Sequence, residues 1–416
     1  MALDKQEVKF SLLDTARPGF LSGIPNRVKL LIFVLSVNSL ASGYLMVFVT
    51  AYLPEVGISS KLVGTIIGAE GITMVIVGIP LGVLSDRIGR KWILNLSSAG
   101  LAPVIFIFAL TREPTLLILA GIIVGVAEGG FLSTLNATIA DQTPVSRRDT
   151  AFAFSFVLTA VFSGIGFSLP FTFSYLASFL GITLAQVHED VLVIFAFVVI
   201  ATPFSLFAIL RNYEEKIVQE KGGSLGASMR NLVKFSGANS LIGLGAGFII
   251  PLIATWLYLK FGVPDKYSGP LLAVSNITIG LSALLSPRMS RRFGIVNAIV
   301  INQGLSTVFM ISLAFVGSPA LAASLYIVRA ALMNMSSPLA DSFLMGLVPR
   351  ERRGLASAIN SVVWRLPNSV TTIAGGIILA SGNYALPFEL ATAFYVVAIS
   401  MFYIFFRGYN LQSLTK

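Results

Sequence analysis

The sequence predicts an all-α membrane protein with twelve transmembrane helices in two related bundles of six. Three observations carry this prediction: a low charge content, a series of long apolar stretches, and a charged loop pattern that recurs in the second half of the chain. Of 416 residues, 55% are hydrophobic and only 12% are charged, and the mean hydropathy is +0.85. A soluble domain has about twice that charged fraction. Lipid is therefore expected to cover much of the surface.

Twelve stretches are apolar and long enough to cross a bilayer as helices, which takes about 20 residues each. They lack the alternation of polar and apolar residues that is typical of membrane strands. Helices are favoured because a lipid-exposed backbone must satisfy its own hydrogen bonds. We expect kinks at Pro170, Pro338 and Pro367 in the fifth, tenth and eleventh stretches. The expected spans are 28–52, 62–84, 92–110, 115–141, 150–178, 190–210, 236–259, 267–287, 295–316, 319–347, 354–381 and 385–406.

The basic residues orient these spans. With both termini on one side, that side holds 23 of the 29 Lys and Arg residues, and the other side holds Lys61, Arg112, Lys260 and Lys266. The positive-inside rule makes the basic side cytoplasmic. We therefore expect a multi-pass protein of the cell membrane with both termini in the cytoplasm. The net charge of +10 is then a topology signal. No nucleic-acid partner is expected, because no compact basic patch with aromatic residues is seen.

The side chains available exclude several chemistries. The chain has no cysteine, which rules out disulfides and thiolate chemistry. Its one histidine, His188, precedes Glu189 and Asp190, so we expect it in a solvated loop rather than in a metal site or a catalytic triad. The first apolar stretch is too long for a signal-peptide core and is expected to remain as a span. No metal, no cofactor and no enzymatic activity are predicted.

Charged loop segments recur at one fixed spacing. "SRRFG" (290–294) lies 205 residues after "SDRIG" (85–89), and "PRERRGLA" (349–356) lies 205 residues after "PVSRRDTA" (144–151). A shared offset at two separate places indicates a duplicated six-helix unit. The predicted division is an N-terminal half (1–210), a polar cytoplasmic linker (211–235) and a C-terminal half (236–416).

The segment "GVLSDRIGRK" (82–91) concentrates charge where the chain is otherwise apolar. A glycine at its start lets two helices approach closely, and its acid can face the positive N-terminus of another helix. The three basic residues hold the loop on the cytoplasmic side, and the second glycine permits a tight turn. A topological anchor is the alternative interpretation. The candidate gating residues are Gly82, Asp86, Arg87, Gly89, Arg90 and Lys91.

This segment resembles the signature loop between spans 2 and 3 of the major facilitator superfamily. The twelve spans, the six-plus-six division and the degenerate second copy also fit that family. The resemblance implies alternating access, with Asp86 facing the helix start after Gly354 and locking the cytoplasmic side shut. In the second copy Arg291 replaces Asp86 and Pro287 replaces Gly82, so a symmetrical second lock is not expected.

Four charged residues lie deep in predicted spans: Glu70, Glu128, Arg329 and Arg365. A bare charge at mid-bilayer costs about 2.5–3.5 kcal/mol or more, so pairing or a wet cavity is expected. In the family arrangement spans 1, 4, 7 and 10 line a cavity, while spans 2 and 11 are neighbours. This implies that Glu128 shares the cavity with Arg329, and that Glu70 meets Arg365. For Glu70 and Arg365 a structural ion pair is favoured over a functional one. The small and polar stripe around Glu128 is typical either of a cavity wall or of a tight packing face.

These features predict a secondary active transporter, because no nucleotide-binding motif is visible. The leading hypothesis is proton-coupled export of an amphipathic or organic compound by a monomer in the bilayer. Uptake of an anionic metabolite and a non-transporting membrane sensor remain open alternatives. The candidates for proton coupling are Glu128 and Glu70, and those for binding the small-molecule solute are Arg329, Arg365, Asn136 and Asn334.

Overall fold

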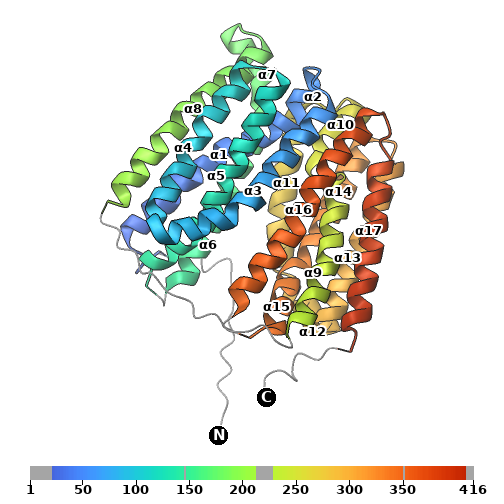
Figure 1. Ribbon diagram of the computed structural model, residues 1–416. Coiled ribbons are helices and arrows are strands. Elements are labelled where there is room, and N and C mark those ends of the chain that lie inside the picture. The colour runs from blue at the N-terminus through green and yellow to red at the C-terminus, as the bar shows by residue number, and fades with distance from the viewer. Residues whose placement is uncertain (1–20, 145–146, 212–227, 350–351, 409–416) are drawn as a thin grey trace.

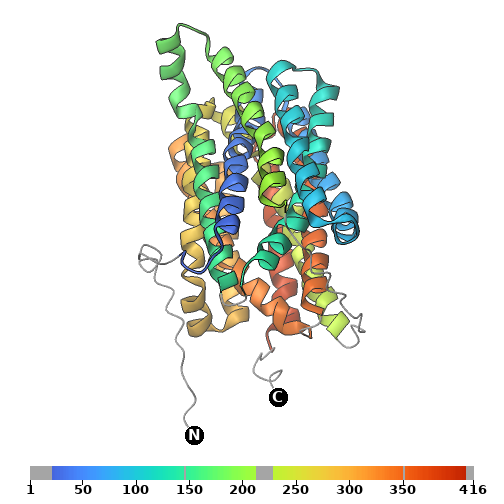
Figure 2. The same cartoon turned by 90° about the vertical axis from the view of Figure 1, so that its left-hand side faces the viewer.

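The computed structural model describes residues 21–144, 147–211, 228–349 and 352–408, and all regular secondary structure in these ranges is helical. Long helices run lengthwise through the molecule in both views (Figure 1, Figure 2). The first half contains α1 (Asn26–Val47), the π-helix η2 (Phe48–Tyr52), α2 (Leu53–Glu55), α3 (Ser60–Ile88), α4 (Arg90–Leu110), α5 (Pro114–Gln142), α6 (Arg148–Ser168), α7 (Pro170–Leu180) and α8 (Leu184–Ile209).

The second half contains α9 (Ser228–Gly247), the 3-10 helix η4 (Ile250–Leu252), α10 (Ile253–Phe261), α11 (Asp265–Ala283), α12 (Ser286–Phe293), α13 (Ile295–Phe315), α14 (Pro319–Met335), α15 (Ser337–Leu347), α16 (Arg353–Ala380) and α17 (Leu386–Phe406). Most of the predicted linker, at 212–227, lies outside the described residues, and α9 begins within its last part.

The described helices account for the predicted spans. Ten helical segments are long and apolar enough to cross a membrane, and the pair α11 and α12, bent by 44°, makes an eleventh. The remaining predicted span, 319–347, consists of α14 and α15, which break at Ser336. Each of those two helices alone is shorter than a bilayer crossing needs. Breaks fall beside Pro170 and Pro338, whereas α16 runs through Pro367 as one helix.

The backbone confirms the 205-residue repeat. Gly89 ends α3 with a φ of 109°, and its equivalent Gly294 ends α12 with a φ of 78°. Both lie in the region of positive φ that glycine tolerates best. Arg148 Nε donates to the carbonyl of Ala140 at 3.0 Å, and the equivalent Arg353 Nε donates to that of Met345 at 3.1 Å. The two halves are therefore copies of one six-helix design.

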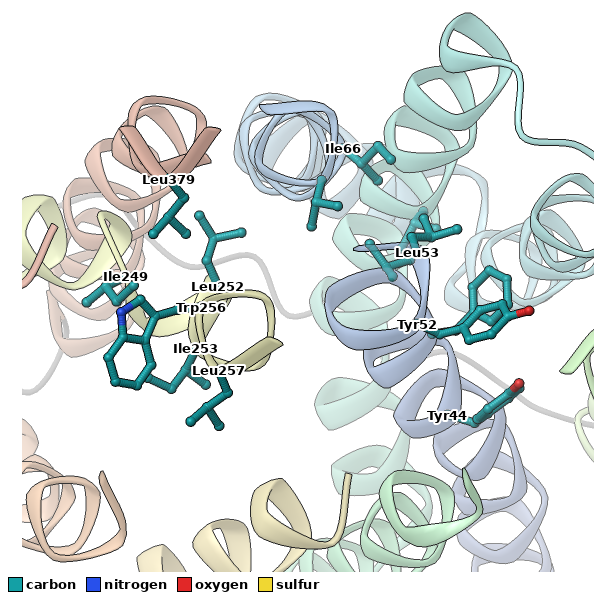
Figure 3. Packing of buried hydrophobic residues seen from close by; sticks show 14 of the residues in the cluster. Tyr44, Tyr52, Leu53, Ile66, Ile249, Leu252, Ile253, Trp256, Leu257 and Leu379 are labelled. Atoms are coloured by element: carbon teal, nitrogen blue, oxygen red, sulfur yellow. The ribbon is translucent and has the colours of Figure 1, made fainter. Parts of the chain in front are cut away.

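The two ends of the molecule are packed differently. We call the end where α1 begins and α17 stops the basic end, and the opposite end, where α2 stops and α11 begins, the far end. At the far end one apolar cluster includes residues of both halves, such as Tyr52 and Leu53 of the first half and Trp256 of the second (Figure 3). At the basic end each half has a separate cluster, around Leu31 in the first half and around Phe343 in the second.

Glycines bring the two halves together at the far end. A Cβ on Gly64 of α3 would lie 2.7 Å from the carbonyl oxygen of Thr372 and 2.9 Å from Cα of Gly376, both on α16. The Ser60 hydroxyl donates to the carbonyl of Gly376 at 3.1 Å. Beside this seam the Thr255 hydroxyl donates to the carbonyl of Thr50 at 2.5 Å. This conformation is therefore closed at the far end.

The Gly64 contact yields a testable prediction. Gly64→Ala should lower the melting temperature of the purified protein, because overpacking a tight contact costs about 1–3 kcal/mol. Gly164→Ala is the matched control, since a Cβ on that helical glycine meets nothing within 4 Å. It should melt unchanged or slightly higher, because Ala favours a helix by about 1 kcal/mol over Gly. Equal melting of the two variants would contradict the tight contact.

Candidate functional site

Three of the four deep charges meet in one cavity between the halves. The cavity has a volume of about 110 Å³, and its lining includes Glu70 of α3, Glu128 of α5 and Arg365 of α16. Glu128 is close enough to both other residues for their charges to interact. Arg365 Nη1 also lies 4.0 Å from Sδ of Met74. The structure therefore brings Glu70 and Arg365 together at the α3–α16 seam and adds Glu128 to them.

Close helix packing creates this arrangement. A Cβ on Gly121 of α5 would lie 2.7 Å from the carbonyl oxygen of Ile66, and one on Gly125 would collide with the carbonyl of Glu70. The glycines of the stripe on α5 are thus a packing face against α3, and Glu128, next to that face, lines the cavity. The glycines of the stripe therefore fit the interpretation as a tight packing face, and Glu128 fits the interpretation as a cavity wall.

The charges in the cavity do not balance. Two carboxylates and one guanidinium leave one negative charge, which is costly in a region surrounded by lipid. Binding one proton or one cationic group would neutralise the set. The volume of about 110 Å³ has room for several water molecules. Drug-sized ligands need pockets of about 300–1,000 Å³. In this conformation the cavity suits an ion and water rather than a bulky solute.

Arg329 lies elsewhere, so the prediction that it shares a cavity with Glu128 is wrong. Its side chain packs inside the C-terminal half, where its guanidinium carbon lies 5.6 Å from the ring centre of Tyr326, and it interacts with Tyr395 of α17. Arg329 is 3% exposed, and its Nε and Nη1 have no hydrogen-bond partner among the described residues. The family arrangement placed α14 beside the cavity, but the direction of the Arg329 side chain depends on packing against α13 and α17.

The two asparagine candidates lie outside the cavity lining. Asn334 of α14 donates from Nδ2 to the carbonyl of Ala330 in its own helix at 2.9 Å. Asn136 is exposed, about two helical turns beyond Glu128 toward the basic end. Polar residues of α16 that were not singled out from the sequence line the cavity instead, namely Asn368, Ser369 and Thr372. The helical spacing of these three residues from Arg365 is the sequence feature that could have identified them as lining residues.

The charged motif of residues 82–91 lies at the basic end, where its acid is exposed. The side chain of Asp86 is 61% exposed, and its Oδ1 accepts a hydrogen bond from Arg90 Nη2 at 3.3 Å. Arg90 also pairs with Asp141 at the end of α5. Among the described residues, no hydrogen bond or ion pair joins Asp86 to the start of α16, where a contact was expected. Within the part of the chain that the structure describes, each half has its own apolar core at this end.

His188 is a further correction, since it lies in the interior rather than in a solvated loop. It occupies the start of α8 and is fully buried. The Tyr44 hydroxyl lies 2.8 Å from its Nδ1, and the ring of Tyr52 stacks on it at 3.7 Å. The helix begins early because Thr183 and Gln186 form a capping box. The capping-box pattern of Thr183 and Gln186 can be recognised in the sequence.

The described residues contain no group of three or more His, Cys, Asp or Glu side chains placed to hold a metal ion. What they provide is a helical bundle in two halves with a charged cavity on the seam between them. These are the features of a membrane carrier of small solutes.

Comparisons with known proteins agree. A sequence profile described as Major Facilitator Superfamily matches residues 31–370 and 235–413. The Multidrug resistance protein MdtG of Dickeya zeae (strain Ech586) is 26% identical over 334 residues, which are 77% of this chain and 78% of that protein. The Inner membrane transport protein YajR of Escherichia coli (strain K12) is 37% identical over 101 residues, which are 24% of this chain and 21% of that protein.

Solved structures share the fold at low identity. The nucleoside transporter NupG superposes with a TM-score of 0.74 at 16% identity, covering 93% of this chain and 100% of its own. A bacterial homologue of the human lysosomal transporter Spinster, in an inward-facing and occupied conformation, gives 0.72 at 16% identity, covering 92% and 96%. The chain belongs to the Major Facilitator Superfamily. It is therefore a multi-pass membrane carrier of small solutes and not an enzyme.

The shared cavity predicts how charge removal affects stability. Arg365→Gln should lower the melting temperature markedly, because it leaves the two carboxyl groups that line the cavity without their counter-charge. Breaking a buried ion pair costs about 3–5 kcal/mol. The double variant Arg365→Gln/Glu70→Gln should regain part of the loss, since fewer negative charges remain. If single and double variants melt at the same temperature, the three charges do not act as one set.

Proposed function

We propose that this carrier exports amphipathic or organic compounds in exchange for protons, with Glu128 and Glu70 as the proton-binding pair. The observation that carries the proposal is the unbalanced cavity, where two acids face one arginine. A proton and a cationic solute can each supply the missing positive charge. Because either one neutralises the set, their binding is mutually exclusive, which is the requirement for exchange. The similarity to proteins named for multidrug resistance supports export.

We further propose that the basic end faces the cytoplasm of the cell that carries the protein in its membrane. The Arg87, Arg90 and Lys91 cluster at this end fits the positive-inside rule. The described conformation is then inward-open, with the shared core closing the outer side. In the alternate state Asp86 would meet the start of α16, and the motif of residues 82–91 would lock the cytoplasmic side. Asp86 lies about six helical turns from Gly64 on the same face of α3, and that face packs on α16 at the far end.

Glu128→Gln tests the proton-coupling role. The amide keeps the size of the side chain but cannot take up and release a proton. Solute accumulation driven by a pH gradient in proteoliposomes should be abolished, while exchange of labelled for unlabelled solute should continue. Glu113→Gln is the control, because that exposed carboxylate caps its own helix at the far end and lies outside the cavity.

Unchanged gradient-driven accumulation in both Glu128→Gln and Glu70→Gln would contradict coupling through the cavity. Exchange that fails in every variant, including the control, would instead favour a sensor that does not transport. Counterflow of solute by the unaltered protein separates these outcomes.

A second candidate function is uptake of an anionic metabolite. The observation that favours it is Arg329, a buried guanidinium with two unpaired nitrogen atoms among the described residues. A planar guanidinium matches a carboxylate or phosphate in two hydrogen bonds. Arg365 lines the cavity together with two acids and interacts with one of them, Glu128, so Arg329 is the stronger anchor for an anionic group.

Arg329→Lys tests this anchor, because lysine keeps the charge and loses the planar fork. If an anionic group binds there, its affinity should fall at least about tenfold, since a hydrogen bond to a charged group contributes about 1.5–3 kcal/mol. Binding of cationic solutes, measured by calorimetry on the same variant, should not change. Unaltered affinity for all solutes in both Arg329→Lys and Arg329→Ala would exclude the anchor.

A further inference from the structure

The far end is closed by titratable groups from both halves. Glu55, at the end of α2, accepts a hydrogen bond from the backbone N–H of Asp265, the first residue of α11. Oδ2 of Asp265 lies 3.4 Å from Nε2 of His188, and these side chains are 3% and 0% exposed. A carboxylate from each half and the chain's single histidine thus meet at the contact that must break when the far end opens.

The histidine in this contact is held rigidly. Tyr44 and Tyr52 project from one side of the first span (Figure 3). The Tyr44 hydroxyl bonds to Nδ1, and the Tyr52 ring stacks on the imidazole. Nε2 is therefore directed at Asp265. Neither Nε2 nor Oδ2 has a hydrogen-bond partner among the described residues, so their 3.4 Å contact is the one polar approach of these two atoms there. Only α11 of the opposite half completes this pair.

The charges around the contact leave it one positive charge short. Arg112 faces His188 and forms an ion pair with Glu189 at 3.3 Å, and Lys266 faces Glu55 and Asp265. Tyr44 and Tyr52 are the remaining titratable neighbours. With the acids ionised and the histidine and tyrosines neutral, three negative charges face two positive ones. A buried set of this kind favours one additional proton, because desolvation and like-charge repulsion both oppose the second carboxylate.

We infer that Glu55, Asp265 and His188 form a proton-binding site at the far end, which gains a proton when the two halves close there and loses it when they open. Opening moves Asp265 away from Glu55 and His188, and water then solvates each carboxylate separately. The closed state therefore holds more protons than the open state. The site rests on the alternating access of the proposed function but not on proton binding by Glu70 and Glu128.

The sign of the effect follows from proton linkage. Low pH favours the state that binds more protons, so acid should close the far end and alkali should open it. For one proton the ratio of closed to open molecules changes by up to about tenfold per pH unit. For an exporter, protons arriving from outside would then help return the carrier to its inward-open state.

Distances between spin labels can measure this equilibrium, because the native chain has no cysteine to remove. One labelled pair, Leu180→Cys with Ser381→Cys, joins exposed positions of the two halves at the far end. A second pair, Ile88→Cys with Ser357→Cys, does so at the basic end. Raising the pH from about 5 to about 8, the range in which a buried carboxyl pair that shares a proton is expected to titrate, should lengthen the first distance and shorten the second. A merely structural contact would not move the two distances in opposite directions.

Glu55→Gln is the decisive variant. The amide oxygen can still accept the Asp265 N–H, but the negative charge is gone, so closure no longer needs a proton. The far end should stay closed at both pH values, with the response reduced to below about twofold per pH unit. Glu113→Gln is the matched control, because Glu113 accepts from Leu116 of its own half. The Leu116 amide holds the pKa of that exposed carboxyl below its usual range. This variant should keep the full response.

Glu128→Gln separates this site from the central cavity. The inference requires the response to persist in Glu128→Gln and to vanish in Glu55→Gln. A full pH response in Glu55→Gln overturns the inference. It is also overturned if neither distance changes with pH in the unaltered protein. If Glu55→Gln loses the response while Glu128→Gln retains gradient-driven accumulation, the far-end site stands and the proposed role of Glu128 fails.

Discussion

Close approach of α3 to two neighbouring helices is the constraint on which the rest of the structure depends. Glycines on α5 admit the backbone of α3 on one side, and glycines of α3 and α16 admit each other on another side. Because α3 packs between a helix of its own half and a helix of the other, Glu70 lines one cavity together with Glu128 and Arg365. Larger side chains at these positions would separate the charges. The electrostatics of the cavity are thus a consequence of backbone packing.

The sequence predicts which residues lie in the membrane better than it predicts which other residues their side chains contact. Composition and apolar length identified the spans, and the fixed 205-residue spacing identified the repeat. The four deep charges were also identified, because charges are rare in such segments. The pairing of Glu128 with Arg329 failed, since helical rise fixes depth along an axis but not rotation about it. Rotation is set by contacts with other helices, which a single chain does not display.

The predictions for His188 and Asp86 have different outcomes. His188 has two acidic neighbours, which favoured a solvated loop, yet the capping box at Thr183 starts the helix before it and directs the ring inward. Asp86 was expected at the start of α16, and among the described residues it bonds to Arg90 of its own half; its contact with α16 stays a prediction for the alternate state. A sequence encodes both states of a protein that alternates between them, and a single structure displays one. The far end shows its contacts here because it is the closed end.

Separate apolar clusters at the basic end bear on how the molecule moves. Each half has its own core there, around Leu31 and around Phe343, whereas the shared cluster at the far end joins them. Well-packed cores resist deformation. Motion between states is therefore expected to rotate whole halves about the seam, with small adjustments at the breaks beside Pro170 and Pro338.

The contact between Thr50 and Thr255 carries a consequence for symmetry. These residues are 205 positions apart and so are copies of each other, and they touch across the seam. Two identical units related by a twofold axis would meet in the same self-matching way. A hydrogen bond has a direction, however: the hydroxyl of Thr255 donates to the carbonyl of Thr50, while the hydroxyl of Thr50 turns to Met46 in its own helix. Two exact copies would also form the reciprocal bond from Thr50 to Thr255, so the duplicated halves are inequivalent at this contact.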